Sequence, residues 1–247
     1  VATVVVPFMA IAYVVFAIIL IFSNLDKIPA AVELIVKGAF NPSAVTGGIV
    51  GTMFIAMQKG VARGIFSNES GLGSAPIASA AARTKEPVRQ GLVTMTGTFL
   101  DTIVICTMTG LSIVITGAWK VDGLEGVAVT SYAFGEGIAF LPERVTSFVL
   151  MVCLVFFAFT TILGWDYYSE SCLKYLTKGN MKFVKVFRYL YILAVFIGPY
   201  MTISEVWTIA DIFNGLMAIP NMIALFALSG IVAKETKKFF DKRKAEK

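Results

Sequence analysis

The fold of this chain is decided by the stretch Arg63-Gly-Ile-Phe-Ser-Asn-Glu-Ser-Gly-Leu-Gly-Ser-Ala-Pro76. The apolar run Ile49–Ala62 precedes it, and the small-residue run Ile77–Ala82 follows it. Glycine is a poor helix former, proline lacks a backbone donor, and Ser and Asn side chains compete for backbone hydrogen bonds. The pattern therefore predicts a helix that opens near residues 64–73.

A helix that opens inside a membrane indicates function. Non-helical backbone at membrane depth is tolerated only where it faces protein or a water-filled cavity. Two half-helices that meet there offer carbonyl groups for a cation and N–H groups for a carboxylate, as in many secondary transporters. A nucleotide loop is a weaker interpretation, because no strand precedes Gly71-x-Gly73. Ala78–Ala82 indicates helix packing, whereas Ser67-Asn68-Glu69 is too polar for packing alone.

The composition places this stretch in a membrane protein. Of the 247 residues, 57% are hydrophobic and 15% are charged, and the mean hydropathy is +0.80. A soluble domain is typically about 45–50% apolar and about 25% charged. The first 22 residues, Val1–Phe22, carry no charge, and roughly 20 helical residues cross a hydrocarbon core. The chain starts inside this apolar segment without a Met, so we interpret it as a fragment of a longer protein.

Six membrane segments are predicted, which makes the chain an all-α integral membrane protein with one or two broken segments. They are Val1–Phe22, Ala44–Ala82, Gln90–Trp119, Pro142–Leu173, Phe183–Ile203 and Ser204–Ala233. Asn214-Gly215 and Pro220 are expected to break or kink the last of them. The connection 120–141 is long for neighbouring spans, and it is expected to act either as a lid or as a passive surface loop.

The cations predict the orientation. Three lie at 83–89, five at 174–188 and seven at 234–247, which gives fifteen on one side, against four on the other (Lys27, Lys37, Lys120 and Arg144). Cytoplasmic loops carry the excess of Lys and Arg, so the C-terminus is predicted to be cytoplasmic. The net charge of +5 therefore reflects orientation rather than nucleic-acid binding. The basic tail is either an orientation signal or a binding segment for anionic lipid.

The remaining polar residues exclude several classes of protein. The chain has no His, and its three Cys residues form no CxxC pair, which excludes His-based triads, imidazole metal sites and a redox pair. Lys59, Arg63, Asp101 and Asp211 lie within predicted segments. They form either a coupling network or a buried ion pair, for example Arg63 with Asp101. An ion channel would need symmetric copies or a re-entrant loop, and an enzyme would have only the two Asp residues as acids.

The motifs resemble one family over nearly the whole chain. They are Arg63-Gly-Ile-Phe-Ser-Asn-Glu-Ser-Gly-Leu-Gly-Ser-Ala-Pro76, Glu86-Pro-Val-Arg-Gln-Gly91, Phe99-Leu-Asp-Thr102, Thr160-Thr-Ile-Leu-Gly-Trp165 and Ala210-Asp-Ile-Phe-Asn-Gly-Leu-Met-Ala-Ile-Pro-Asn221. Together they resemble the alanine/glycine:cation symporter family. The resemblance implies a leucine-transporter-type fold with two inverted repeats. Residues 1–22 would then close the first repeat, 23–43 would be an extracellular connection, 44–233 the second five-helix repeat and 234–247 a basic cytoplasmic tail.

The same resemblance implies sodium-driven uptake of alanine or glycine across the cell membrane, with no enzymatic step. The substrate-binding residues would be Gly64, Ile65, Phe66, Ser67, Asn68, Gly71 and Trp165. The hydroxyl groups of Thr160 and Thr161 would bind the sodium ion, for which oxygen ligands are suited. The partners expected are the amino acid, the sodium ion and the lipid bilayer.

Overall fold

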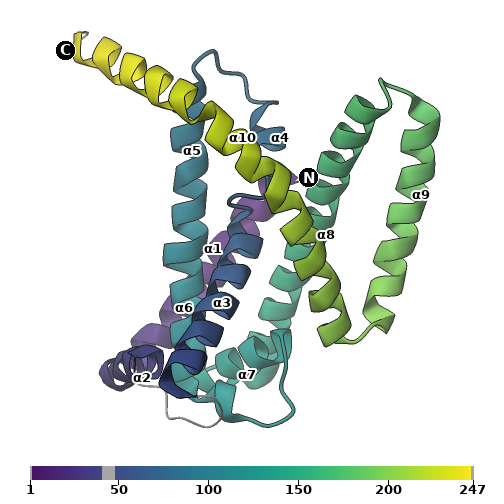
Figure 1. Ribbon diagram of the computed structural model, residues 1–247. Helices are drawn as coiled ribbons and strands as arrows, with labels where there is room; N and C mark the ends of the chain where they lie inside the picture. The colour runs from purple at the N-terminus through teal and green to yellow at the C-terminus, as the bar shows by residue number, and fades with distance from the viewer. Residues whose placement is uncertain (1, 41–47, 246–247) are drawn as a thin grey trace. The chain divides into compact units, whose positions relative to one another are not determined.

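The computed structural model describes residues 2–40 and 48–245, which form helices and turns without any strand (Figure 1). The predicted start of the second segment at Ala44 lies outside the described residues. The helices are α1 (Ala2–Ser23), α2 (Ile28–Phe40), α3 (Gly48–Asn68), α4 (Ala75–Ser79), α5 (Pro87–Phe99), α6 (Cys106–Thr116), α7 (Val127–Gly137), α8 (Glu143–Leu176), α9 (Met181–Ile197) and α10 (Ile203–Ala245). A π-helical stretch, Leu100–Ile105, joins α5 to α6.

Four helices in the described part of the chain are long and apolar enough to cross a membrane. They are Val4–Ser23, Pro87–Thr116, Glu143–Leu176 and Ile203–Ala245. The chain is therefore a multi-pass helical membrane protein, as the composition predicted. The α3 helix carries Lys59 and Arg63, and α9 has only 17 residues. Both are helical where membrane segments were predicted, and the count of six spans stays a prediction.

The chain divides into two compact units, and the first contains residues up to 61 together with 102–167. Its buried core joins α1, α7 and α8 through Ala17, Leu20, Phe134, Ile138 and Leu150. The helices α1 and α7 approach so closely that a Cβ atom at Gly137 would lie 2.5 Å from Cγ of Leu20. The amide of Asn24 donates hydrogen bonds to the carbonyl oxygens of Leu20, at 2.9 Å, and Gly137, at 2.8 Å.

Part of the connection 120–141 belongs to this core, which differs from the expectation of a passive surface loop. It contains α7, whose residues Ala133 and Phe134 are at most 1% exposed, and Ile138 directly after it is fully buried. This segment is therefore not a passive surface loop, because its apolar side chains pack against α1. A role as a lid stays a prediction.

The second unit contains residues 62–101 and 168 onwards. At the α8–α9 turn, Glu170 accepts from Arg188 Nε at 2.6 Å, and Lys174 Nζ lies 3.1 Å from the other carboxylate oxygen. The α10 helix is continuous over 43 residues with Pro220 inside it, so the expected break near Asn214-Gly215 is absent. A helix interrupted by one Pro loses a single backbone hydrogen bond, and the flanking turns hold the rest.

Candidate functional site

The predicted opening of the helix exists, but it begins later than the sequence suggested. The α3 helix continues through Gly64 and ends at Asn68, and α4 starts at Ala75. Between them Glu69 has a φ of 55°, and Gly71 and Gly73 have φ values of 81° and 83°. These left-handed values turn the chain, and only glycine adopts them without steric cost. Residues 64–68 therefore form the last helical turn before the opening rather than the opening itself.

The opening is held by a side chain of α10. The amide Nδ2 of Asn221 donates to the carbonyl oxygen of Gly71 at 2.9 Å. The side chain lies so close that a Cβ atom at Gly73 would be 3.1 Å from Asn221 Oδ1. Leu72 and Ser74 of the same turn are buried. Asn221 lies in a motif of the sequence, but its role was missed because nothing local links it to a segment 150 positions away.

The predicted substrate residues of α3 have different surroundings. A Cβ atom at Gly64 would have no neighbour within 4 Å, and Ile65 is exposed. The ring of Phe66 meets the ring of Trp207 edge-on, with 5.1 Å between centroids. The Ser67 hydroxyl donates to Asp101 Oδ2 at 2.6 Å, and Asn68 Oδ1 accepts from the backbone N–H of Ser70 at 3.0 Å.

A charged cluster lies beside this last turn. Arg63 Nη2 donates to Asp211 Oδ2 at 2.7 Å, and the guanidinium carbon lies 3.8 Å from the centroid of the Trp207 ring. The other terminal nitrogen of Arg63 is buried and has no hydrogen-bond partner among the described residues. The pair suggested from the sequence, Arg63 with Asp101, is therefore wrong. Arg63 pairs with α10, whereas Asp101 binds the hydroxyl of Ser67.

Asp101 owes its place to the π-helical stretch Leu100–Ile105. A π-helical turn inserts an extra residue into the helix and shifts the faces of the residues around it, and such turns are frequent at functional sites. Here the carboxylate of Asp101 reaches the end of α3. Hydroxyl and carboxylate oxygen atoms thus stand together beside the opening, which is a chemistry suited to a cation or an ammonium group.

The predicted sodium ligands lie on α8 in the first unit, together with Trp165, whereas Gly64–Asn68 and Gly71 belong to the second. The Thr160 hydroxyl donates to the carbonyl oxygens of Phe156, at 2.9 Å, and Phe157, at 3.1 Å, while Thr161 is exposed. Sequence reasoning missed Asp166 on the same helix, whose buried Oδ1 has no hydrogen-bond partner in the part of the chain that the structure describes. An acidic residue within the apolar predicted segment Pro142–Leu173 was the signal for it.

The comparison with known families shows which family the chain belongs to. A family model described as the sodium:alanine symporter family matches residues 1–247. The chain belongs to the sodium:alanine symporter family. This confirms the resemblance drawn from the motifs, and the names of the relatives agree with a transporter rather than an enzyme.

Three proteins similar to this sodium:alanine symporter family member carry names that differ in the substrate they give, if any. An uncharacterized transporter of Haemophilus influenzae is 54% identical over 98% of this chain and 52% of its own length. The sodium/alanine symporter AgcS of Methanococcus maripaludis is 46% identical, with the same shares covered. The probable sodium/glutamine symporter GlnT of Bacillus subtilis is 38% identical over 97% of this chain and 48% of its own length. The chain thus spans about half the length of these curated relatives.

Proposed function

We propose that this chain is part of a sodium-coupled symporter for a small neutral amino acid, alanine or glycine, in the cell membrane. The symporter works by alternating access, and the second inverted repeat of a leucine-transporter-type fold, residues 44–233, lies within this chain. The family supports the class of transport. The observation that carries the proposal is the opening between α3 and α4, held by Asn221.

The opening offers the backbone groups that an amino acid needs. The last carbonyl groups of a helix have no partner within the helix, so the end of α3 at Asn68 presents oxygen atoms to an ammonium group or a cation. In the turn that follows, Ser70 donates its N–H to Asn68 Oδ1 and Leu72 donates its N–H to the carbonyl oxygen of Glu69 at 3.2 Å. The N–H groups of Gly71 and Gly73 are therefore the ones proposed for the carboxylate. Because α4 has only five residues, we rely on the N–H groups of the turn itself, around Gly71, rather than on a helix dipole.

The side chains at the end of α3 support a small substrate. Phe66 packs edge-on against Trp207, and in the proposal its ring forms one wall of the substrate site. Ile65 stands next to it, while Gly64 leaves the space over the backbone open. In the proposal the substrate lies over Gly64, with Ile65 and Phe66 limiting its side chain. The family resemblance adds Trp165 of α8 to the proposed substrate-binding residues.

Thr160 and Thr161 are the proposed sodium ligands. The hydrogen of the Thr160 hydroxyl is already donated to carbonyl groups of its own helix. Its oxygen lone pairs remain available as acceptors, and lone pairs on oxygen are what a hard cation binds. Asp166, whose Oδ1 has no hydrogen-bond partner within residues 2–40 and 48–245, lies about one and a half helical turns further along the same helix.

Uptake of labelled alanine by the full-length protein in sealed vesicles tests the proposal. We expect saturable uptake in a sodium gradient, loss of uptake when potassium replaces sodium, and recovery of the label as unchanged alanine. Unlabelled glycine should compete, and glutamine should compete weakly. Uptake that is independent of sodium, or flux that does not saturate, would contradict the proposal and would favour a channel or another coupling ion.

A further inference from the structure

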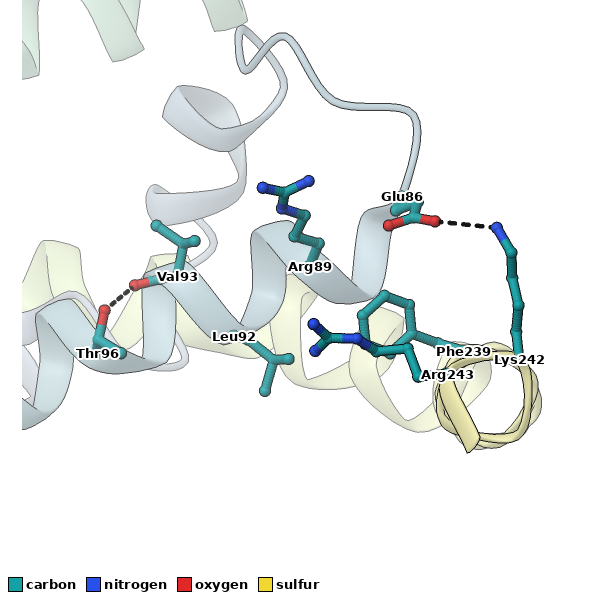
Figure 2. Close-up of a pocket in the computed structure, with 8 residues that line it drawn as sticks. All are labelled: Glu86, Arg89, Leu92, Val93, Thr96, Phe239, Lys242 and Arg243. Atoms are coloured by element: carbon teal, nitrogen blue, oxygen red, sulfur yellow. Dashed lines mark hydrogen bonds and ion pairs between the residues drawn. The ribbon is translucent and has the colours of Figure 1, made fainter. Parts of the chain in front are cut away.

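One pocket of the second unit lies away from the proposed transport site. It has a volume of about 410 Å³ and lies between the first turns of α5 and the last turns of α10 (Figure 2). Three cationic side chains line it, Arg89, Lys242 and Arg243, with the single acid Glu86. Its apolar lining includes Leu92, Val93 and Phe239. The pocket therefore combines a cationic rim with an apolar wall.

The positive charge of the pocket is only partly neutralised. Lys242 Nζ lies 3.6 Å from Glu86 Oε1, and both side chains are substantially exposed. The guanidinium of Arg243 lies over the ring of Phe239, 5.7 Å from its centroid. Neither Arg89 nor Arg243 makes an ion pair within residues 2–40 and 48–245. Two guanidinium groups thus line one pocket without a carboxylate of their own, an arrangement that attracts an anion.

The position of the pocket indicates which anion. The candidate span Pro87–Thr116 starts at its edge, so the pocket lies where α5 leaves the apolar part of the membrane. Val93 is exposed one turn further into that span. A free phosphate would use only the cationic rim. A phospholipid would place its phosphate at the rim and its acyl chains along the apolar wall.

We propose that this pocket binds the headgroup of an anionic phospholipid. Guanidinium groups bind phosphate oxygen atoms through two parallel hydrogen bonds, which assigns the phosphate to Arg89 and Arg243. The contact between Arg243 and Phe239 holds that guanidinium in place before the lipid arrives. The ion pair with Lys242 offsets the negative charge of Glu86, which would otherwise repel the headgroup. Binding of a lipid at this pocket requires only that the protein is inserted in a membrane, and it does not depend on which substrate is transported.

Native mass spectrometry of the full-length protein in zwitterionic micelles tests the site, with phosphatidylglycerol and phosphatidylcholine as probes. We expect one phosphatidylglycerol molecule to bind well above the level of phosphatidylcholine. The double variant Arg89→Gln/Arg243→Gln should weaken phosphatidylglycerol binding roughly thirtyfold, from about 1 kcal/mol per cation. Arg89→Lys/Arg243→Lys keeps the charge but loses the paired hydrogen bonds, and it should show a smaller loss.

The matched control is Lys237→Gln/Lys244→Gln. Both residues are exposed cations of α10 on the helix face opposite Phe239, since successive residues turn by about 100°. This control removes the same charge and should change binding less than about threefold, because neither side chain lines the pocket. Equal losses in both double variants would mean a diffuse basic tail and would overturn the site. Competition by inorganic phosphate as strong as that by the lipid would also overturn the lipid assignment.

Discussion

Substitution of Gly64 gives the most direct test of the proposed substrate site. It is helical, and an added Cβ atom would meet nothing within 4 Å, so Gly64→Val should fold normally. We expect this variant to lose alanine uptake, because the branched side chain would fill the space proposed for the substrate. The measurement is initial uptake rate per unit of protein in the membrane.

Gly60→Val is the matched control for this variant. Gly60 lies one turn earlier on the same face of α3 and also has no neighbour within 4 Å. It should leave uptake within about twofold, as surface substitutions usually have small effects. Normal uptake by Gly64→Val, or equal loss in both variants, means that the substrate does not lie against this turn.

Ile65 is proposed to limit the size of the substrate. Its side chain is exposed beside Gly64, so Ile65→Ala should enlarge the site without disturbing the contact between Phe66 and Trp207. One methylene in such a pocket is worth about 1–3 kcal/mol, so leucine should inhibit alanine uptake at least about tenfold more strongly than before. If the order of inhibitors stays the same, Ile65 is not part of the substrate wall.

Thr160 and Thr161 carry the sodium proposal. Thr160→Ala and Thr161→Ala should each raise the sodium concentration that gives half-maximal uptake, because each removes an oxygen ligand. Thr208→Ala on α10 is a suitable control, since its hydroxyl also donates to a carbonyl of its own helix, that of Ser204, at 2.8 Å. An unchanged sodium dependence in both α8 variants, with transport retained, removes these residues from the cation site.

At the scale of elements, the turn between α3 and α4 should be sensitive to glycine replacement. The φ of 81° at Gly71 is strained for any residue with a side chain, at a cost of about 1–2 kcal/mol. Gly71→Ala should lower the thermal unfolding midpoint and reduce uptake. Gly97→Ala in the middle of α5 should instead stabilise the protein by about 0.5–1 kcal/mol, because Gly97 is helical with open space around it.

Those two glycines also show which elements could be predicted from the sequence. Apolar runs of 20 or more residues located α1, α8 and α10 to within a few residues at their starts, since hydropathy determines what can cross a bilayer. The position at which α3 opens was predicted less well, because it depends on the backbone φ angles of individual residues. Gly64 is compatible with a helix, and the chain turns only at Glu69, Gly71 and Gly73. The short α7 helix was missed because its burial against α1 depends on tertiary packing.

The contacts of the candidate site were beyond sequence reasoning for a similar reason. Polar residues at membrane depth identified Arg63, Asp101 and Asp211 as notable. Their partners depend on how α3 meets α10 and on the π-helical stretch at Asp101. Neither is encoded by spacing along the chain. The pairing of Asn221 with Gly71 is a further case, because two motifs were visible and the bond between them was not.

At the scale of the whole molecule, the cation distribution predicts a cytoplasmic C-terminus. In a variant without its native cysteines, Lys244→Cys should resist a membrane-impermeant thiol reagent added outside intact cells. Asp122→Cys, in the connection before α7, should react under the same conditions. After the cells are opened, both should be labelled. Ready labelling of Lys244→Cys in intact cells, with no reaction at Asp122→Cys, would falsify the predicted topology.

The uninterrupted course of α10 has a mechanical consequence. Asn221, which grips the turn at Gly71, and Arg243, which lines the headgroup pocket, belong to one continuous helix. They are separated by about 33 Å along its axis at about 1.5 Å per residue. Because the helix is continuous, a rotation of one end about the helix axis also rotates the other end. A lipid bound to Arg243 would therefore oppose movement of α10 and of the turn at Gly71 that Asn221 holds. The lipid composition of the membrane would then change the rate of the transport cycle.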